Sequence, residues 1–218
     1  MERLAWEMGH RHVAGVDEVG LGPLAGPVVA AAVILPAGAQ LPGLDDSKRL
    51  SPTKRERLEV LIRRRAVACA VHAVAPEVVD EMGLTRARQL AMSGAVAKLE
   101  VPADYLLVDA WEVPDLPLPQ MCVVKGDGIC ASIMAASVIA KVHRDRLMVE
   151  YDRQYPGYGF AVHKGYGTAA HLRALAELGP APIHRRSWAP VRALAAARGG
   201  AGGCEPEGGA VPPSGLGR

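Results

Sequence analysis

Acidic residues interrupt or follow three apolar segments of the sequence, at positions where a carboxylate is costly to bury. An ionised carboxylate in apolar surroundings needs a cationic partner or a metal ion. Mg²⁺ prefers a few carboxylates together with water and phosphate oxygens, and two such ions could activate a water and stabilise the leaving oxygen of a phosphodiester. The acids are Asp17 and Glu18 within 13–21, Asp109 after 105–108, and Asp127 after 121–124.

The spacing of these acids does not by itself establish that they converge. Side chains alternate between the two faces of a strand, so Asp17 and Glu18 reach the same side only where the strand twists or ends. Taken singly, each acid also suits a structural role in an Asx turn, a helix cap or a surface ion pair. The metal-binding and structural interpretations both stay open on this evidence.

The elements that would position the acids follow from hydrophobic periodicity and turn signals. Apolar and β-branched runs predict strands at 13–21, 28–35, 67–74, 105–108 and 121–124. Helical spacing predicts helices at 84–99, 130–151, 168–178 and 188–197. Ser51, a good N-cap before Pro52, predicts another helix that ends at Arg65. A hairpin of strands followed by strands separated by helices predicts a mixed α/β sandwich.

Composition places the chain among ordinary globular proteins. Of the 218 residues, 50% are apolar and 22% are charged, and no run approaches the roughly 18 apolar residues of a membrane span. The first residues contain no apolar segment of a secretory signal. We therefore expect a cytoplasmic protein with no membrane partner and a disordered Gly- and Pro-rich tail at 199–218. The four cysteines form no CxxC pair and no zinc spacing, and we expect buried free thiols; three lie in apolar surroundings (Cys69, Cys122 and Cys130) and Cys204 lies in the tail.

Positive charge gathers in the C-terminal half, although the net charge of the chain is only +2. From residue 138 to residue 198 there are ten Lys and Arg residues against four acids. Such a half suits a polyanionic partner. A solvated basic face explains the same distribution equally well.

Seven stretches, in order over residues 13–195, resemble bacterial ribonuclease HII, the type 2 ribonuclease H. Any one of them is a weak signal, whereas seven in the family's order are specific. They are 15–28 (GVDEVGLGPLAGPV), 44–51 (LDDSKRLS), 107–109 (LVD), 124–127 (VKGD), 135–145 (AASVIAKVHRD), 163–168 (HKGYGT) and 184–187 (HRRS).

The resemblance implies a ribonuclease H-like fold: a central mixed sheet flanked by helices, with a helical C-terminal part, in one catalytic domain over residues 1–198. It implies a monomer that hydrolyses the phosphodiester 5′ to a ribonucleotide and leaves 3′-hydroxyl and 5′-phosphate ends. The implied partners are RNA/DNA hybrids and duplex DNA with embedded ribonucleotides. The implied cofactor is Mg²⁺ or Mn²⁺ in a two-metal mechanism, and the catalytic metal ligands would be Asp17, Glu18, Asp109 and Asp127.

The same resemblance implies roles in substrate binding. Tyr166, a further catalytic residue, would stack on the deoxyribose after the ribonucleotide, and Lys48 would contact the phosphate near the cut. The loop Gly20-Leu21-Gly22 would recognise the ribose 2′-hydroxyl, largely through backbone groups. The family usually has arginine where this chain has Leu21, which removes one possible phosphate contact, about one unit of salt-dependence slope.

Several other residues with reactive or aromatic side chains are better explained by structure than by chemistry. They are His143 and His163, expected on a helix surface or in a loop because Mg²⁺ favours oxygen ligands; Asp145, expected in an ion pair one helical turn after Lys141; Trp111 and Trp188, expected to pack rather than to stack on bases; and Ser137, which has no evident histidine base.

Two alternative functions come from neighbouring and distant classes. One is another nuclease on the same fold, such as a resolvase or a type 3 ribonuclease H, although the latter carries an extra N-terminal domain and only about 12 residues precede the first predicted strand here. The other is a catalytically silent nucleic-acid-binding protein. The presence of all four acids disfavours it.

Overall fold

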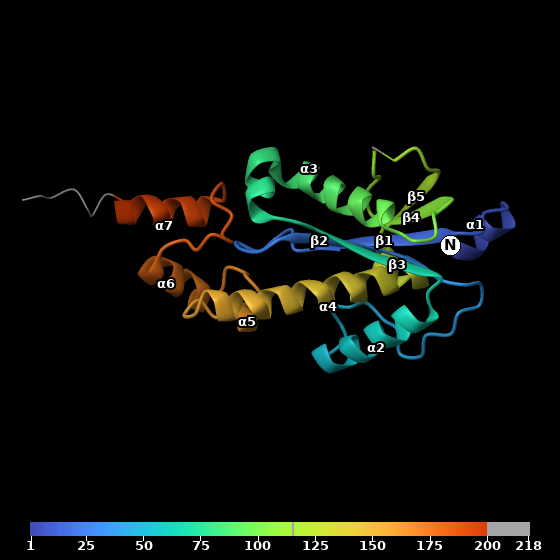
Figure 1. The fold of residues 1–218 in the computed structure, drawn as a ribbon, viewed down its shortest axis with the longest axis horizontal. Coiled ribbons are helices and arrows are strands. Elements are labelled where there is room, and N and C mark those ends of the chain that lie inside the picture. Colours follow the sequence, from blue (N-terminus) through green and yellow to red (C-terminus); the bar gives the residue numbers. More distant parts are fainter. Residues whose placement is uncertain (115, 200–218) are drawn as a thin grey trace, which may run out of the picture.

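The structure is a computed structural model that describes residues 1–114 and 116–199, with side chains to residue 196. The predicted disordered tail and Cys204 lie outside the described residues, apart from Gly199. The elements, in chain order, are α1 (Glu2–Glu7), β1 (Val13–Val19), β2 (Val28–Ile34), α2 (Pro52–Arg65), β3 (Ala68–Val74), α3 (Pro76–Ala97), β4 (Tyr105–Asp109), β5 (Gln120–Val123), the 3-10 turn η1 (Gly126–Gly128), α4 (Ala131–Gln154), α5 (Phe160–His163), α6 (Ala169–Leu178) and α7 (Ala189–Gly199) (Figure 1).

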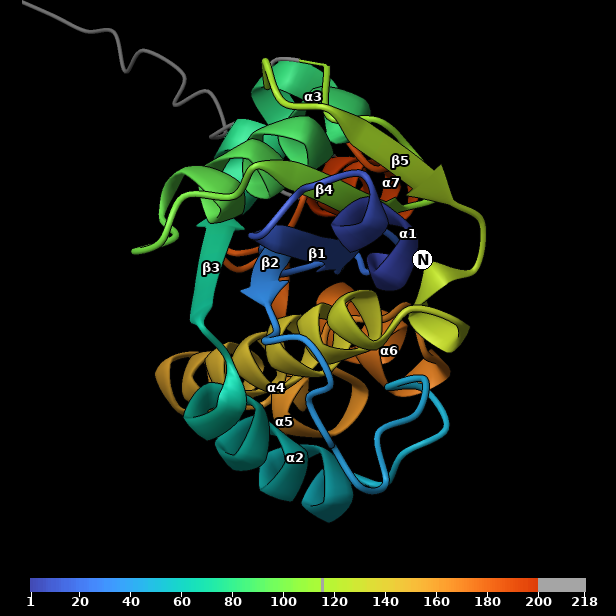
Figure 2. The same ribbon diagram turned by 90° about the vertical axis from the view of Figure 1, so that its right-hand side faces the viewer.

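The five strands form one mixed sheet in the order β3-β2-β1-β4-β5. β1, β2 and β3 pair antiparallel as a meander, and β4 and β5 add parallel to the other side of β1. Helices cover both faces: α3 lies on one, and α4 with α2 beyond it on the other (Figure 2). The predicted fold class, a mixed sheet flanked by helices, is confirmed.

The position of β2 in the sheet explains why its sequence is an unbroken run of apolar residues. All seven of its residues are buried, because it lies in the interior of the sheet and both faces are covered. Val28, Ala30, Ala32 and Ile34 pack in the cluster under α3. The alternating residues 29, 31 and 33 pack in the cluster under α4, which is the period of two expected of a strand.

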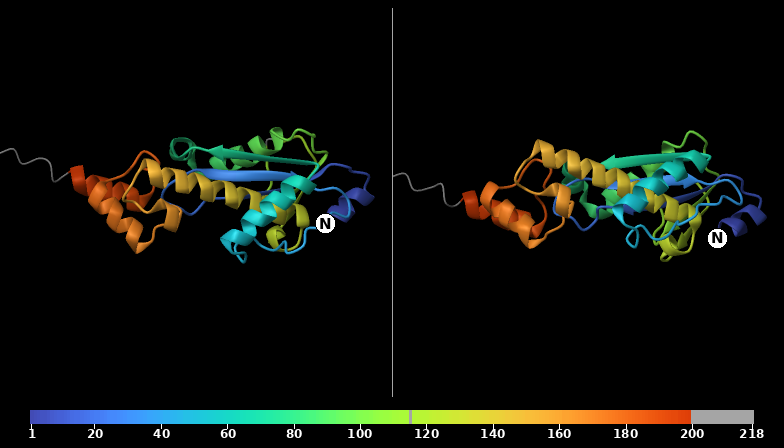
Figure 3. Two further views of the ribbon diagram at one scale, coloured as in Figure 1. Left: turned by 60° about the horizontal axis from the view of Figure 1, so that its bottom comes forward. Right: turned by 90° about the horizontal axis from the view of Figure 1, so that it is seen from below.

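The C-terminal helices gather at one end of the molecule, opposite α1 and the N-terminus (Figure 3). Phe160 of α5 and Met148 of α4 are fully buried in a small cluster of their own. Leu175 of α6 and Val191 of α7 form another with Leu24. This end of the molecule therefore rests on the loop between β1 and β2, which has consequences for the site.

The structure corrects several sequence-based expectations. β1 ends at Val19 rather than at residue 21, and α3 begins at Pro76 rather than at 84, with a kink at Gly83 (φ 78°). The short elements α1, η1 and α5 were not expected. Cys130 is buried as predicted, but Cys122 is exposed and Cys69 half-buried. None of the helices within the described ranges is both long and apolar enough to cross a membrane.

Candidate active site

Parallel pairing brings two of the predicted acids to the same edge of the sheet. The register pairs Val16 of β1 with Val108 of β4, so Asp17 and Asp109, which follow them, lie at neighbouring strand ends. Asp127 reaches this edge through the turn after β5. There the N–H of Gly126 donates to Oδ1 of Asp109 at 2.8 Å, which ties the η1 turn to the end of β4.

Helix α4 crosses β1 in direct contact, and a glycine makes this possible. A Cβ on Gly15 would lie 2.1 Å from the carbonyl carbon of Ser132, so any larger residue would push the helix away from the strand. The close approach brings Ser137 of α4 into hydrogen-bonding contact with Asp17. Ser137 therefore serves as a partner of an acid, consistent with its rejection as a nucleophile.

Burial and mutual repulsion disfavour the ionised forms of the acids at this edge. Burial, together with the neighbouring charges of Glu18 and Asp109, raises the pKa of Asp17 to about 8. Burial also raises the pKa of Glu18 to about 7, against the opposing effect of the Arg88 guanidinium. The pKa of Asp109 is raised by burial and by the charge of Asp127. A cation bound among these groups would favour their ionised forms.

A divalent metal ion fits this set of groups. Oε2 of Glu18 is buried and has no hydrogen-bond partner among the described residues, and carboxylate oxygens are the ligands that Mg²⁺ and Mn²⁺ prefer. Within residues 1–114 and 116–199, however, no three acidic, histidine or cysteine side chains lie close enough together to coordinate one ion as they stand.

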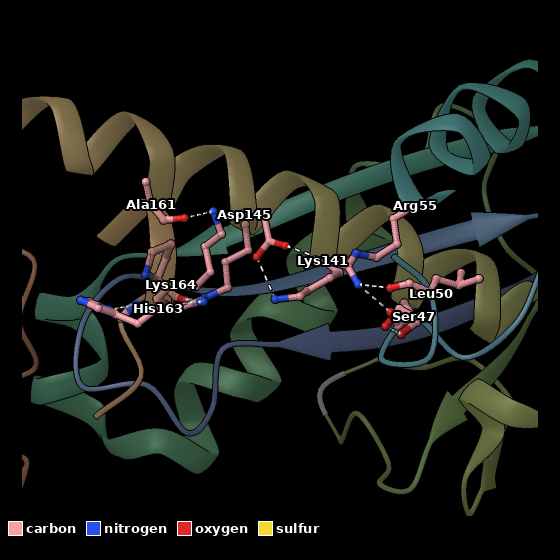
Figure 4. Close-up of polar contacts among 12 residues, drawn as sticks. Ser47, Leu50, Arg55, Lys141, Asp145, Ala161, His163 and Lys164 are labelled. Carbon is pink, nitrogen blue, oxygen red and sulfur yellow. Dashed lines mark hydrogen bonds and ion pairs between the residues drawn. The ribbon is translucent and has the colours of Figure 1, made fainter. Parts of the chain in front are cut away.

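Lys48 lies directly on this acidic edge. Its Nζ donates to Oδ2 of Asp127 at 2.8 Å, and this hydrogen bond raises the pKa of the lysine. The loop that presents Lys48 is fixed by Arg55 of α2, which donates to the carbonyls of Ser47 (2.9 Å) and Leu50 (2.6 Å) (Figure 4). The Ser47 hydroxyl also bonds the Ser137 hydroxyl at 2.8 Å. The loop of Lys48 and the side chain of Asp17 therefore both contact Ser137 of α4.

A second set of contacts continues from this loop along α4. Oδ1 of Asp145 accepts from Nζ of Lys141 at 2.8 Å, and its Oδ2 lies 3.5 Å from the Arg55 guanidinium (Figure 4). The predicted ion pair of Asp145 is therefore confirmed. These side chains and Lys164 line a cavity of about 880 Å³ between α2, α4 and α5, whose charged groups are mostly paired with one another.

Two completely buried arginines hold the loop between β1 and β2. Arg185 donates to the carbonyls of Gly20, Leu21 and Gly26. Arg144 of α4 donates to those of Pro27 (3.0 Å), Ala25 (3.1 Å) and Lys164 (3.0 Å). Burial and the charge of Arg144 lower the pKa of Arg185 only to about 10, so its guanidinium group remains charged near neutral pH. Neither arginine forms an ion pair within the described part of the chain.

Gly20 is required by this arrangement. Its φ is +96°, and a Cβ there would lie 2.5 Å from Nε of Arg144 and 2.6 Å from the Pro27 carbonyl. Only glycine adopts this conformation at so little cost. The loop is also tied to the C-terminal part by a hydrogen bond from the Leu24 N–H to the Gly165 carbonyl at 2.8 Å.

Tyr166 lies beside this loop. A Cβ on Gly22 would be 3.7 Å from Cε1 of the Tyr166 ring, and the side chain of Tyr166 is 43% exposed. Its backbone is fixed: the carbonyl accepts from Nδ1 of buried His171 at 2.9 Å, and the N–H bonds the His163 carbonyl at 2.9 Å. The predicted loop and the predicted tyrosine are therefore neighbours.

Sequence reasoning missed the two buried arginines and misjudged one tryptophan. Arg144 and Arg185 belong to the HRD and HRRS stretches of the sequence. An arginine in a sequence is first interpreted as a surface cation, and only the hydrogen bonds to six backbone carbonyls show the role of these two. Trp188 packs as expected. Trp111 does not: 62% of it is exposed. His163 is held by its ring hydrogen bond to the Tyr158 carbonyl, and His143 is half-buried on α4.

Comparisons with known proteins agree with this geometry. The sequence profile of the family described as Ribonuclease HII matches residues 14–191. A ribonuclease HII of Geobacter metallireducens is 56% identical over 191 residues, which cover 88% of this chain and 90% of the relative.

Two solved structures are similar as well. The ribonuclease H2 of Pyrococcus horikoshii has a TM-score of 0.73 at 26% identity, over 85% of this chain and 97% of that one. Bst ribonuclease HIII, at 20% identity over 88% of this chain and 72% of that one, has a TM-score of 0.69 and shares the fold. The chain therefore belongs to the ribonuclease HII family, metal-dependent endoribonucleases that act on RNA/DNA hybrids.

Proposed function

We propose that the protein cuts the phosphodiester on the 5′ side of ribonucleotides, both in RNA/DNA hybrids and in duplex DNA with embedded ribonucleotides, and leaves 3′-hydroxyl and 5′-phosphate ends. The observation that carries this proposal is the juxtaposition of the 20–22 loop and Tyr166 with the acidic ends of β1 and β4. The loop and the tyrosine that could recognise a ribose are thus next to the acids that could bind a metal ion. Excision of ribonucleotides from DNA is the repair process that such a reaction begins.

Asp17, Glu18, Asp109 and Asp127 are the proposed ligands of Mg²⁺ or Mn²⁺. When bound, two such ions supply an activated water and charge stabilisation for the leaving oxygen. Bst ribonuclease HIII, which has the same fold, has been crystallised with Mn²⁺. The support within this chain is the unpartnered Oε2 of Glu18 and the raised pKa values of Asp17, Glu18 and Asp109.

The 20–22 loop is suited to donate hydrogen bonds to a 2′-hydroxyl. Arg185 occupies the carbonyls of Gly20 and Leu21, whereas no hydrogen bond from the N–H of Leu21 or of Gly22 is found within the residues that the structure describes. Because the arginine fixes the peptide planes in advance, the free N–H groups need little reordering when substrate binds. A 2′-hydroxyl, present in RNA and absent in DNA, is their proposed acceptor.

Lys48 and Tyr166 complete the proposed substrate contacts. Lys48 is 77% exposed at its side chain although it bonds Asp127, so its ammonium group can turn to a phosphate near the cut. The exposed ring of Tyr166 can stack on the deoxyribose that follows an embedded ribonucleotide in duplex DNA. We further expect the protein to act as a monomer in the cytoplasm, without a membrane partner.

The experiment that tests this proposal is cleavage of three end-labelled duplexes: a DNA duplex with one ribonucleotide, a long RNA/DNA hybrid and an all-DNA duplex, each with Mg²⁺ and with Mn²⁺. We expect a single cut 5′ to the lone ribonucleotide, cuts along the hybrid and none in DNA. Product ends are checked by ligation and by phosphatase sensitivity. Equal cutting of all-DNA duplex would replace the proposal with a general nuclease on this fold.

A further inference from the structure

A pocket of about 410 Å³ adjoins the candidate active site and has no part in the chemistry described above. It lies between the 20–22 loop, helix α3 and the segment after β4. The residues that matter in its lining are Leu21, Leu84, Arg88, Trp111, Glu112 and Pro114. The pocket therefore begins on the loop proposed to read the ribose.

Arg88 is a cation in this pocket whose guanidinium forms no hydrogen bond among the described residues. Its Nε is buried and lacks an acceptor, and no hydrogen bond or ion pair of its guanidinium is found in the described ranges 1–114 and 116–199. Glu112 lines the same pocket without pairing to it. The guanidinium is close enough to the active site for its charge to act on Glu18. A guanidinium offers five N–H donors in a plane, and among the described residues none of these donors has an acceptor.

Trp111 supplies a flat apolar surface beside that cation. The Arg88 guanidinium lies over the indole, 5.2 Å from the ring centroid, so the ring holds the cation in place through a cation–π contact. The tryptophan is nevertheless 62% exposed, which leaves ring surface open to solvent. A fixed guanidinium next to an exposed aromatic ring matches the two parts of a nucleotide, its phosphate and its base.

We propose that this pocket is a subsite for one nucleotide of the substrate that flanks the cleaved bond, with Arg88 binding its phosphate and Trp111 stacking on its base. The inference rests on the proposed function, since it takes the 20–22 loop as the place of the ribonucleotide. Leu21 lines the pocket and packs on the cluster under α3. An arginine at 21 would reach into the same space, so in this chain the cation comes from the neighbouring helix instead of from the loop.

Binding without metal ions isolates this contact from catalysis. The fluorescence anisotropy of a labelled DNA duplex with one ribonucleotide is measured in a chelator across a salt series. Arg88→Met should weaken binding about tenfold and reduce the salt-dependence slope by about one counterion. The matched control is Arg64→Met, an exposed arginine of α2 on the other side of the sheet, which should leave both unchanged. Equal behaviour of the two variants would overturn the proposal.

The tryptophan and the loop give two independent checks. Trp111→Ala should weaken binding about tenfold without changing the slope, and Trp111→Phe should recover most of the loss, because stacking requires a ring rather than an indole. The double variant Leu21→Arg with Arg88→Met should regain the lost unit of slope, since the cation returns to the same pocket. A slope that stays low in the double variant contradicts a shared phosphate position.

Cleavage by the wild type separates this inference from the proposed function. If the wild type cuts at the lone ribonucleotide but Arg88→Met binds like Arg64→Met, the subsite is wrong and the function stands. If Arg88→Met shows the altered slope but the wild type does not distinguish ribonucleotides, the pocket binds nucleic acid and the proposed specificity is wrong. The melting temperatures of all variants are measured as well, and equal values would show that altered folding does not cause the differences in binding.

Discussion

The acidic strand ends and the C-terminal framework, meaning buried Arg144, Arg185, His171 and His184, both place charged or titratable groups away from water. They differ in whether those groups find partners within the chain. The two arginines donate to six backbone carbonyls, whereas Glu18 keeps a buried oxygen with no hydrogen-bond partner in the part of the chain that the structure describes. Buried polar groups are costly unless satisfied. We therefore interpret the C-terminal framework, whose buried polar groups are hydrogen-bonded, as support for the fold. The acidic strand ends, which keep an unbonded buried oxygen, are interpreted as a ligand-binding site.

The sharpest way to break this comparison is to remove one charge from the acidic edge. Asp109→Asn should lower cleavage by at least about a thousandfold, because a metal ligand is lost, while the melting temperature in the absence of metal stays the same or rises as repulsion is relieved. Turnover with Mg²⁺ and thermal unfolding are measured on the same preparation. Near-normal turnover would remove Asp109 from the site.

Asp104 offers the matched control for that variant. Its carboxylate accepts from the N–H groups of Arg11 (2.8 Å) and His12 (3.0 Å), and these bonds hold the pKa of Asp104 below its usual value despite burial. Asp104→Asn should therefore lose some stability and keep its activity, the reverse of Asp109→Asn. If both variants behave alike, satisfaction within the chain does not separate the two kinds of acid.

The next largest effect should come from the framework. Arg185→Met leaves the carbonyls of Gly20, Leu21 and Gly26 without their donor, which should cost about 3 kcal/mol of unfolding free energy. It should also reduce the preference for a ribonucleotide over all-DNA duplex, because the loop is no longer held. The control is Arg186→Met, the exposed neighbour. Lost stability with unchanged preference would show that Arg185 supports the fold alone.

A pH dependence should separate the two regions further. His171 and His184 share a contact of 3.0 Å between their Nε2 atoms, and burial lowers the pKa of His184 to about 4, with the charge of His171 acting in the same direction. A folded-state pKa below the ordinary value near 6.5 means that the neutral ring is favoured by folding. Its stabilisation is complete above about pH 6.5 and is lost as the pH falls towards 4.

The measurement is the unfolding free energy of the wild type and of His184→Gln in urea between pH 7 and pH 4. The titrations of groups that do not contact His184 are common to both proteins and cancel in the difference, which therefore reports on His184 together with its partner His171. That difference should shrink by up to about 3 kcal/mol on acidification. Parallel curves would show that His184 titrates normally in the folded state.

Local pattern predicted the parts of the structure that depend on local interactions. The strands now seen as β2, β3 and β4 were expected within two residues of their observed bounds, Asp17 was placed inside the first strand, and Asp109 was placed at the end of the fourth. The start of α3 was missed because Gly83 interrupts the periodicity; Pro76, suited to a first helical position, was the available signal.

What could not be predicted depends on contacts between distant residues. Arg144 lies more than a hundred positions from the loop that it holds, and Arg185 more than 150. The exposure of Trp111 follows from its position after β4, beside α3, where Arg88 rather than an apolar residue covers its ring. The four acids were recognised through the family resemblance, since spacing alone left their convergence open.

The smallest effect should come from the residue that belongs to both regions. Tyr166 has a backbone fixed by His171 of the framework and by His163, and it is 43% exposed beside Gly22. Tyr166→Ala should leave the melting temperature nearly unchanged, because little apolar surface is lost from the interior. It should lower cleavage at a lone ribonucleotide about tenfold, in line with the loss of one stacking contact. Tyr166→Phe keeps the ring and should retain most of the activity. If Tyr166→Phe is as impaired as Tyr166→Ala, the hydroxyl rather than the stacked ring is the active group; if Tyr166→Ala mainly loses stability, the ring belongs to the framework and not to the substrate site.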